Sequence, residues 1–409
     1  MTIRFLLLAV ASLVAAPVAA LTQADIDAGA VRATRGLERT TRSLASNRLH
    51  GRDNNTADST RAQRYLIGRL KRRGLGANTA ASAFDAYKQP FVQSGQTGTN
   101  LLAVIPGREL PNEYLIIGAH YDHLDTRSTP SGDCSSTGAT GGEVCNGATD
   151  NATGVAAVLA IGKALKKLPG GPRRSVVLAL WDAEEDGLLG SLYYVNHPLV
   201  PLAQTVGYIN YDIAGATLLP TLRNVTFSVG AETGGSALRA IVGSAVAAQT
   251  LTAGPFSYIF GQLRSDYANF VNAGVPTVFF SDSTGGCYHT TGDDVGIVNF
   301  PKLEQQSALG FRTAVGLIEA ATPPAFVAPN PALATFEDAL TLQMVLTTAL
   351  PDLALFSPAD QAQFTTFKTQ VDQIVADGPG LFDAGDVGTV LGAAVTLIGT
   401  LTNVGCQAF

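Results

Sequence analysis

Short apolar runs alternate with helix-like stretches through the middle of this 409-residue chain. Six runs have the length and composition of buried strands: LLAVIPG, YLIIGA, SVVLALWD, VGYINYDI, VTFSVG and PTVFFSD. Helix-like sequences separate several of them, most clearly NATGVAAVLAIGKALKKL and GGSALRAIVGSAVAA. Because short buried strands separated by helices form layered α/β domains, we expect a mostly parallel central sheet flanked by helices.

Five residues that can bind a metal ion are spread along these elements: His120, Asp150, Glu185, Asp212 and His289. Side chains that follow parallel strands meet at one edge of the sheet, so we expect the five to converge there. Imidazole nitrogen and carboxylate oxygen are typical zinc ligands. Two zinc ions would need a shared carboxylate, and Asp150 is the expected bridge because it lies between the other ligands in chain order.

Three residues beside these ligands have expected supporting roles. Glu184 precedes a ligand in the acidic turn DAEED, where it can point at a water on the metals rather than at the metals. Asp122 can accept the N–H of the His120 imidazole and so fix its tautomer. His123 follows directly and is a candidate for a similar outer role. The remaining histidines, His50 and His197, are expected to be structural.

The sequence resembles the M28 family of zinc peptidases, of the secreted aminopeptidase type. The motifs that carry the resemblance are GAHYDH, GATDNATG, DAEEDGLLGS, NYDIAG, RSDYANFVNAGVP and CYHTTGDD, and the resemblance extends over about residues 45–320. It implies two zinc ions per chain held by the five ligands, with Glu184 as the general base. It also implies that N-terminal residues are removed from peptides or proteins, with the free α-amine bound at one zinc.

Three further positions belong to these motifs. Asp293 matches a family position and is expected to steady the loop after His289. Tyr288 either hydrogen-bonds the developing oxyanion or simply packs beside that ligand. Tyr267 stands where many family members have His, which leaves open what makes the supporting contact there.

Other functions remain as alternatives. A carboxypeptidase or dipeptidase on the same fold would need a cation for the substrate carboxylate, and Arg264 is the candidate. A glutaminyl cyclase with one zinc, and a metal-free, non-catalytic binding homologue, are further alternatives, although the complete ligand set argues against both. Ser265 and Asp266 do not indicate a serine hydrolase, because no G-x-S-x-G elbow accompanies them.

Composition and the N-terminus bear on partners and location. The formal net charge of −6 argues against nucleic acid as a partner. Residues 1–20 have a basic start, an apolar core and small residues at the end, as in a cleaved signal peptide, so we expect a secreted or periplasmic protein without stable membrane association. Four cysteines fit that oxidising route. Cys134 and Cys145 flank one loop and are the favoured disulfide; Cys287 and Cys406 are expected to be disulfide-bonded or inert.

A Pro-rich linker, ATPPAFVAPNP, separates a catalytic domain of residues 21–322 from a C-terminal helical segment of residues 323–409. In that segment Ser357 is the expected N-cap of a helix that begins at Pro358. Its final apolar stretch is expected to be a buried helix rather than a membrane anchor. All candidate ligands lie upstream, so a chain that ends near Thr322 should still bind zinc and hydrolyse a small aminoacyl substrate.

Overall fold

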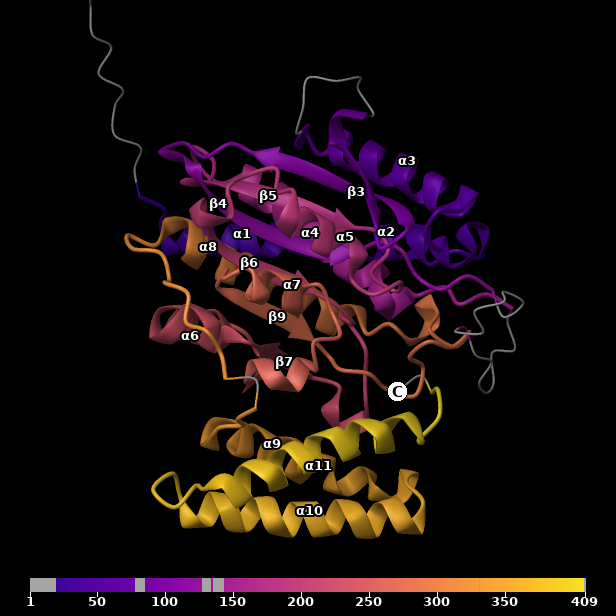
Figure 1. Cartoon of the computed structure of the whole chain (residues 1–409), viewed down its shortest axis with the longest axis vertical. Coiled ribbons are helices and arrows are strands. Elements are labelled where there is room, and N and C mark those ends of the chain that lie inside the picture. Colours follow the sequence, from indigo (N-terminus) through magenta and orange to yellow (C-terminus); the bar gives the residue numbers. More distant parts are fainter. Residues whose placement is uncertain (1–19, 78–84, 127–133, 135–142, 331, 408–409) are drawn as a thin grey trace, which may run out of the picture.

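The computed structural model of the chain describes residues 20–77, 85–126, 134, 143–330 and 332–407. The expected signal peptide therefore lies, except for its last residue, outside the described residues. Within them the chain forms a central sheet with helices on both faces and a layer of C-terminal helices beyond one edge of the sheet (Figure 1). The expected α/β architecture is confirmed.

Among the described residues, nine strands pair in one sheet, in the order β1-β3-β5-β4-β6-β9-β7-β8, with β2 also on β3. The four central strands β5, β4, β6 and β9 run parallel, whereas the pairings at the margins include antiparallel ones. The sheet is therefore mixed at its edges and parallel at its centre. The strands are β1 Gly76–Ala77, β2 Lys88–Gln93, β3 Gln96–Ile105, β4 Leu110–His120, β5 Arg174–Trp181, β6 Thr205–Tyr211, β7 Val225–Val229, β8 Thr252–Phe256 and β9 Thr277–Ser281.

The register of the central strands brings their carboxyl ends to one edge. His120 at the end of β4 is paired with Trp181 at the end of β5. Tyr211 at the end of β6 is paired with Phe280 of β9. Every residue of β5, β6 and β9 is buried, which explains why these segments are continuous apolar runs rather than alternating ones. The residues that follow them therefore emerge side by side.

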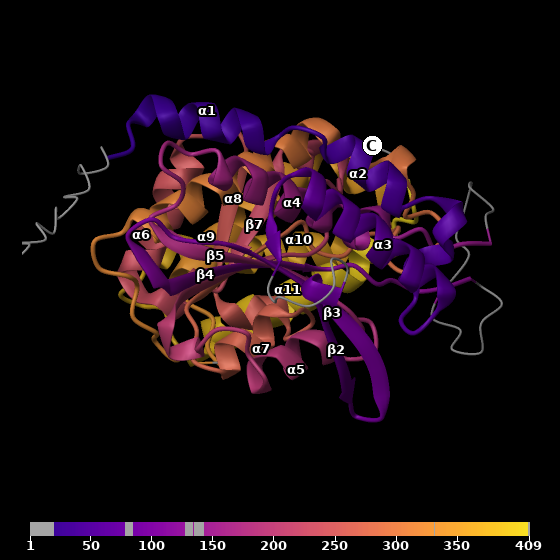
Figure 2. The same ribbon diagram turned by 90° about the horizontal axis from the view of Figure 1, so that it is seen from above.

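Helices cover both faces of the sheet (Figure 2). One face carries α1 Gln23–Ala33, α2 Leu37–Leu44, α4 Thr153–Lys166, α6 Gly235–Ala247 and α8 Phe300–Glu319, with α3 Ala57–Arg72 beside them. The other carries α5 Leu189–Asn196 and α7 Tyr267–Asn272. Helix α4 is almost entirely buried, as its sequence of Ala, Val, Leu and Ile requires.

The C-terminal layer consists of α9 Phe336–Ala349, α10 Pro358–Asp377 and α11 Ala384–Thr402. Side chains cap the start of each helix: Thr335 and Asp383 in capping boxes, and Ser357 ahead of Pro358 as expected. Helix α11 is long and apolar enough to cross a membrane, judged by length and composition, and 22% of that window is buried. Helix α11 is therefore only partly buried, contrary to the expectation of a buried helix: Val390 and Ala393 pack in the core, whereas Val395 is exposed.

Polar and covalent contacts attach this layer to the sheet. Asp338 of α9 accepts hydrogen bonds from the backbone N and the hydroxyl of Ser257, both at 2.7 Å. Apolar residues of α9, α10 and α11 share a core with the helix α5 and α7 face of the sheet. A disulfide joins Cys406 to Cys287 in the loop after β9. The second disulfide, Cys134–Cys145, is the one favoured from the sequence.

Candidate metal centre

The predicted ligands converge at the carboxyl edge of the central strands. His120 is the last residue of β4, and Asp212 directly follows β6. Asp150 lies in the short helical turn Ala148–Ala152 that leads into α4. Glu185 lies in the turn after β5, and His289 in the loop after β9. The first three side chains are buried and that of His289 is about a quarter exposed, at 27%.

Asp150 stands between two groups of ligands. Its Oδ1 lies 3.2 Å from Nε2 of His120, and that same nitrogen lies 3.3 Å from Oδ1 of Asp212. Its Oδ2 lies 3.4 Å from Nε2 of His289, and that nitrogen lies 3.0 Å from Oε2 of Glu185. Each carboxylate oxygen of Asp150 thus faces a different histidine, as a bridging ligand requires.

His123 is closer to the ligands than the sequence indicated. Its side chain is fully buried, and Nδ1 lies 2.6 Å from Oε1 of Glu185. His123, Asp150 and Glu185 place ligand atoms within 4.8 Å of one another, as do His120, Asp150 and Asp212. Spacing alone could not show this, because His123 lies beyond the end of β4, where no repeating pattern predicts the direction of a side chain.

Acidic residues around the ligands hold the backbone that carries them. Asp293 accepts hydrogen bonds from the hydroxyl and the N–H of Thr149, both at 2.8 Å, and from the N–H of Asp150 at 3.0 Å. The carboxylate of Asp122 accepts the N–H of Glu185 at 3.2 Å. Nδ1 of His120 is 3.1 Å from the backbone carbonyl oxygen of Asp122 and 3.6 Å from its carboxylate.

Arg52 is buried close to the predicted ligands, which the sequence did not indicate. Arg52 donates to the carbonyl oxygens of Leu44, Tyr121, Asn146 and Gly147 at 2.7–3.1 Å, which ties the end of β4 to the loop before Asp150. Burial lowers the pKa of Arg52 to about 10, and nearby carboxylates oppose this shift, so the guanidinium stays charged at neutral pH. Its φ of 73° is rare for a residue other than glycine. Nothing in the local sequence pattern marks Arg52 as different from the exposed basic residues near it.

The charges at the site suit a bound cation. Burial raises the pKa of Glu184, and the carboxylates of Asp212 and Glu185 raise it further, well above its usual value. Burial lowers the pKa of His289, but hydrogen bonding to Asp150 and Glu185 raises it to about 10. Without a bound metal ion, the buried carboxylates therefore compete for protons. A divalent ion would relieve that repulsion, and the imidazole–carboxylate donor set fits zinc.

Glu184 occupies a different position from its neighbour Glu185. Its Oε2 is 4.0 Å from Nε2 of His120, and its side chain lines a cavity beside the ligands. The turn that presents it is closed by the N–H groups of Gly187 and Leu188, which donate to the carbonyl oxygen of Glu184. Both glutamates line the cavity, but Glu185 contacts His123 and His289 at 2.6 and 3.0 Å, whereas Glu184 lies 4.0 Å from His120.

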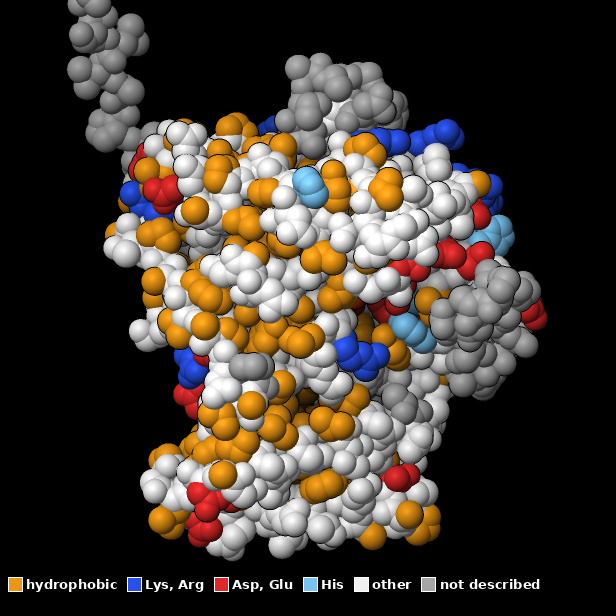
Figure 3. Space-filling view, viewed as in Figure 1, with side chains coloured by type: hydrophobic (Ala, Val, Ile, Leu, Met, Phe, Trp, Pro, Cys, Tyr) orange, Lys and Arg blue, Asp and Glu red, His pale blue; other side chains and the backbone are white. Residues whose placement is uncertain are grey.

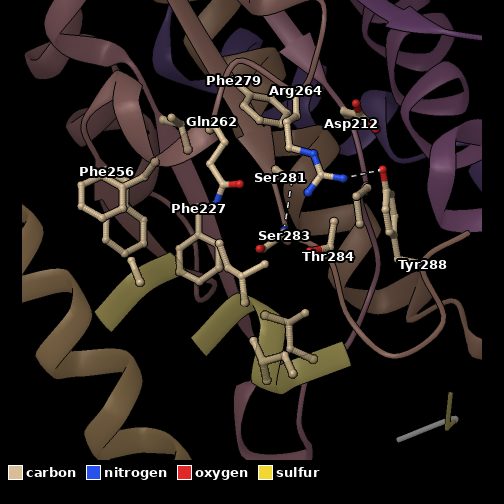
Figure 4. A pocket seen from close by; sticks show the side chains of 18 of the residues that line it. Asp212, Phe227, Phe256, Gln262, Arg264, Phe279, Ser281, Ser283, Thr284 and Tyr288 are labelled. Atoms are coloured by element: carbon tan, nitrogen blue, oxygen red, sulfur yellow. Dashed lines mark hydrogen bonds between the residues drawn. The ribbon is translucent and has the colours of Figure 1, made fainter. Parts of the chain in front are cut away.

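Tyr288 and Arg264 lie at the edge of the same cavity (Figure 4). Arg264 donates to the Tyr288 hydroxyl at 3.1 Å, and its guanidinium carbon is 5.4 Å from the ring centre. The Tyr288 ring stacks on that of His289, with 3.8 Å between centroids. Tyr267, by contrast, is fully buried, and its hydroxyl accepts the N–H of Leu263. Tyr267 therefore supports the loop that carries Arg264 rather than facing the cavity.

Comparisons with known proteins agree with this architecture. The chain is similar to leupeptin-inactivating enzyme 1 of Streptomyces exfoliatus, with 30% identity over 294 residues, which are 64% of this chain and 55% of that protein. It thus spans about half the length of that relative. The fold is similar to the LapA aminopeptidase of Legionella pneumophila (TM-score 0.57, 15% identity, 79% of this chain and 81% of that one). It is also similar to the glutaminyl cyclase of Porphyromonas gingivalis (TM-score 0.53, 17% identity, 70% and 97%).

The two structural likenesses are at low sequence identity and show the fold alone. A family model gives the more specific assignment, because it matches residues 100–309 and so includes every predicted metal ligand. The helices α9, α10 and α11 lie outside that match. The chain belongs to peptidase family M28.

Proposed function

We propose that this protein is an exported dizinc aminopeptidase that removes N-terminal residues from peptides or proteins. The observation that carries the proposal is Asp150, whose two carboxylate oxygens face two different histidines at 3.2 and 3.4 Å. One zinc would be held by His120, Asp150 and Asp212, and the other by Asp150, Glu185 and His289. Family membership and the printed name of LapA as an aminopeptidase support the proposal.

Zinc, when bound, acts as a Lewis acid that polarises the scissile carbonyl and lowers the pKa of water. Glu184 accepts the proton of the attacking water and delivers it to the leaving amine. Its buried position favours this role, because burial raises the pKa of the carboxyl and so makes it a stronger base. The Tyr288 hydroxyl, which accepts a hydrogen bond from Arg264, would donate one to the oxygen on which negative charge develops.

Two disulfides and the leader-like residues 1–20 support export to an oxidising compartment. The proposed activity is tested by measuring zinc content and hydrolysis of a panel of aminoacyl anilides, with and without chelator. We expect about two zinc ions per chain, and activity that chelator abolishes and added zinc restores. Anilide hydrolysis that persists in chelator, in protein without zinc, would contradict the proposal.

A carboxypeptidase is the second candidate, because Arg264 offers a cation beside the ligands. A peptide blocked at its N-terminus distinguishes the two activities. An aminopeptidase leaves this peptide intact and cleaves the matching anilide with a free amine, whereas a carboxypeptidase does the reverse. Arg264→Ala should also abolish activity only in the second case, since the aminopeptidase would retain the Tyr288 hydroxyl.

A further inference from the structure

An apolar cavity of about 140 Å³ extends from the metal centre toward the C-terminal helices. Asp150, Glu184, Glu185 and Asp212 line its inner end. Figure 3 shows the hollow between the sheet domain and the C-terminal layer, with hydrophobic side chains around it. A group bound at the metals would therefore have this cavity directly beside it.

Two separate parts of the chain form the walls. Phe227, Phe256 and Phe279 come from β7, β8 and β9 and lie on the sheet side (Figure 4). The opposite wall comes from the C-terminal helices, namely Leu342 and Val345 of α9 and Ala394, Leu397 and Leu401 of α11. A large part of the apolar lining thus comes from a segment that the family model does not include.

We propose that helices α9 and α11 form the outer wall of the pocket that receives the first side chain of the substrate, and thereby select peptides with a large apolar N-terminal residue. This inference rests on the proposed aminopeptidase function, since it places the α-amine at the metals and the adjoining side chain in the cavity. Residues of the C-terminal layer are then specificity determinants, although they contribute nothing to the chemical step.

Size and polarity of the cavity favour this occupant. A dry cavity of about 150 Å³ lined by aliphatic and aromatic side chains binds benzene in another protein, so 140 Å³ accommodates a phenyl or isobutyl group. The apolar walls disfavour a cationic side chain, because it would lose its hydration there. A small side chain such as that of alanine would enter but leave most of the apolar lining without contacts.

A covalent tether fixes the outer wall to the catalytic loop. Cys406, just beyond α11, is bonded to Cys287, which lies two residues before His289. The two segments next to the disulfide approach so closely that a Cβ on Gly286 would lie 2.0 Å from the carbonyl oxygen of Gly405. The wall is therefore held against the loop that carries a metal ligand, as a pocket of defined depth requires.

Filling the cavity from the helix side tests the proposal. Ala394 lines the cavity and is buried, whereas the adjacent Val395 is 58% exposed and does not line the cavity. The variants Ala394→Phe and Val395→Phe therefore place the same side chain on the same helix, in and out of the pocket. For Ala394→Phe we expect kcat/KM on phenylalanyl anilide, relative to alanyl anilide, to fall roughly tenfold or more. Val395→Phe should leave this ratio unchanged, and an equal ratio in both variants would overturn the proposal.

A second variant enlarges the pocket, in case Ala394→Phe prevents folding. Leu401→Ala removes part of the outer wall, so activity on tryptophanyl anilide should rise relative to leucyl anilide; no change in that ratio would count against the wall.

Binding of L-phenylalaninol and L-alaninol by calorimetry gives a readout independent of turnover. If the wild type hydrolyses no anilide but binds L-phenylalaninol, and Leu401→Ala weakens that binding, the proposed reaction fails while the pocket assignment stands. If wild type hydrolyses anilides without preferring apolar residues, the pocket assignment alone fails.

Discussion

The metal centre and the outer wall of the cavity lie next to each other but are built in different ways. The candidate metal centre consists of residues near the carboxyl ends of parallel strands, where a shared register brings distant parts of the chain together. The outer wall is made from one face of α9 and one face of α11, which are positioned by packing, polar contacts and one disulfide. Under the proposed function, the reaction and its selectivity would be encoded in separate segments of the chain.

The largest effect expected at the metal centre comes from the two adjacent glutamates. Glu184→Gln should retain near-normal zinc content while turnover falls roughly a hundredfold or more on every substrate, because it removes the proton acceptor. Glu185→Gln should instead weaken zinc binding, because it alters a predicted ligand. Zinc content by elemental analysis, together with kcat on alanyl and phenylalanyl anilides, separates the two. Equal loss of zinc in both variants would contradict the assigned roles.

Substitution of Arg52 is expected to have a smaller effect on the candidate metal centre. Arg52→Lys cannot donate to all four carbonyl groups, so the loop before Asp150 should loosen. We expect zinc affinity to fall about tenfold to a hundredfold, and the free energy of unfolding to fall by about 3 kcal/mol. Arg48→Lys, at an exposed position nearby, is the matched control. If Arg52→Lys changed the selectivity between alanyl and phenylalanyl anilides instead of lowering activity on both equally, this would contradict the assignment of Arg52 to the support of the metal ligands.

Removal of the C-terminal layer tests whether the outer wall is needed for selectivity but not for zinc binding. A chain that ends at Thr322 and carries Cys287→Ser should still bind zinc and hydrolyse alanyl anilide, while its preference for phenylalanyl anilide is lost. The full-length chain with Cys287→Ser is the control. Removal exposes the apolar side chains of the shared core, so lower solubility is also expected. A folded truncated chain that binds no zinc would show that the two regions are not separable.

The smallest expected effect is a pH dependence of stability near the metal centre. Burial, together with Asp186 and Asp122, raises the pKa of Asp53 from 3.8 to about 6. The native state therefore holds this proton more tightly than the unfolded state, and stability falls as pH rises from about 4 to about 6. Asp53→Asn should remove that decrease, which is worth about 1 kcal/mol at neutral pH once solvent screening is allowed for. Thermal unfolding of both proteins at pH 4 and pH 7.5 measures it, and an equal difference at the two pH values would contradict the assignment.

The sequence predicted the sheet and the convergence of the five ligands because both follow from regular patterns. Buried parallel strands are continuous apolar runs, and ligands such as Asp212 directly follow them. Other parts depend on contacts that have no local pattern. The four carbonyl groups around Arg52 come from three separate segments. Likewise, four cysteines allow three sets of pairings. In the sequence, only the loop that Cys134 and Cys145 flank favours one of these sets.

The disulfide between Cys287 and Cys406 has a consequence for the order in which the cleft is made. The two cysteines are 119 residues apart, so a growing chain presents the loop of His289 well before its partner exists. The bond therefore cannot form while the C-terminal segment is still being synthesised. Only a chain that has been extended past residue 406 and then oxidised can carry this link between the end of α11 and the loop of His289. The C-terminal layer is thus tied to the loop of His289 only after both segments have been made, when the two thiols meet an oxidant.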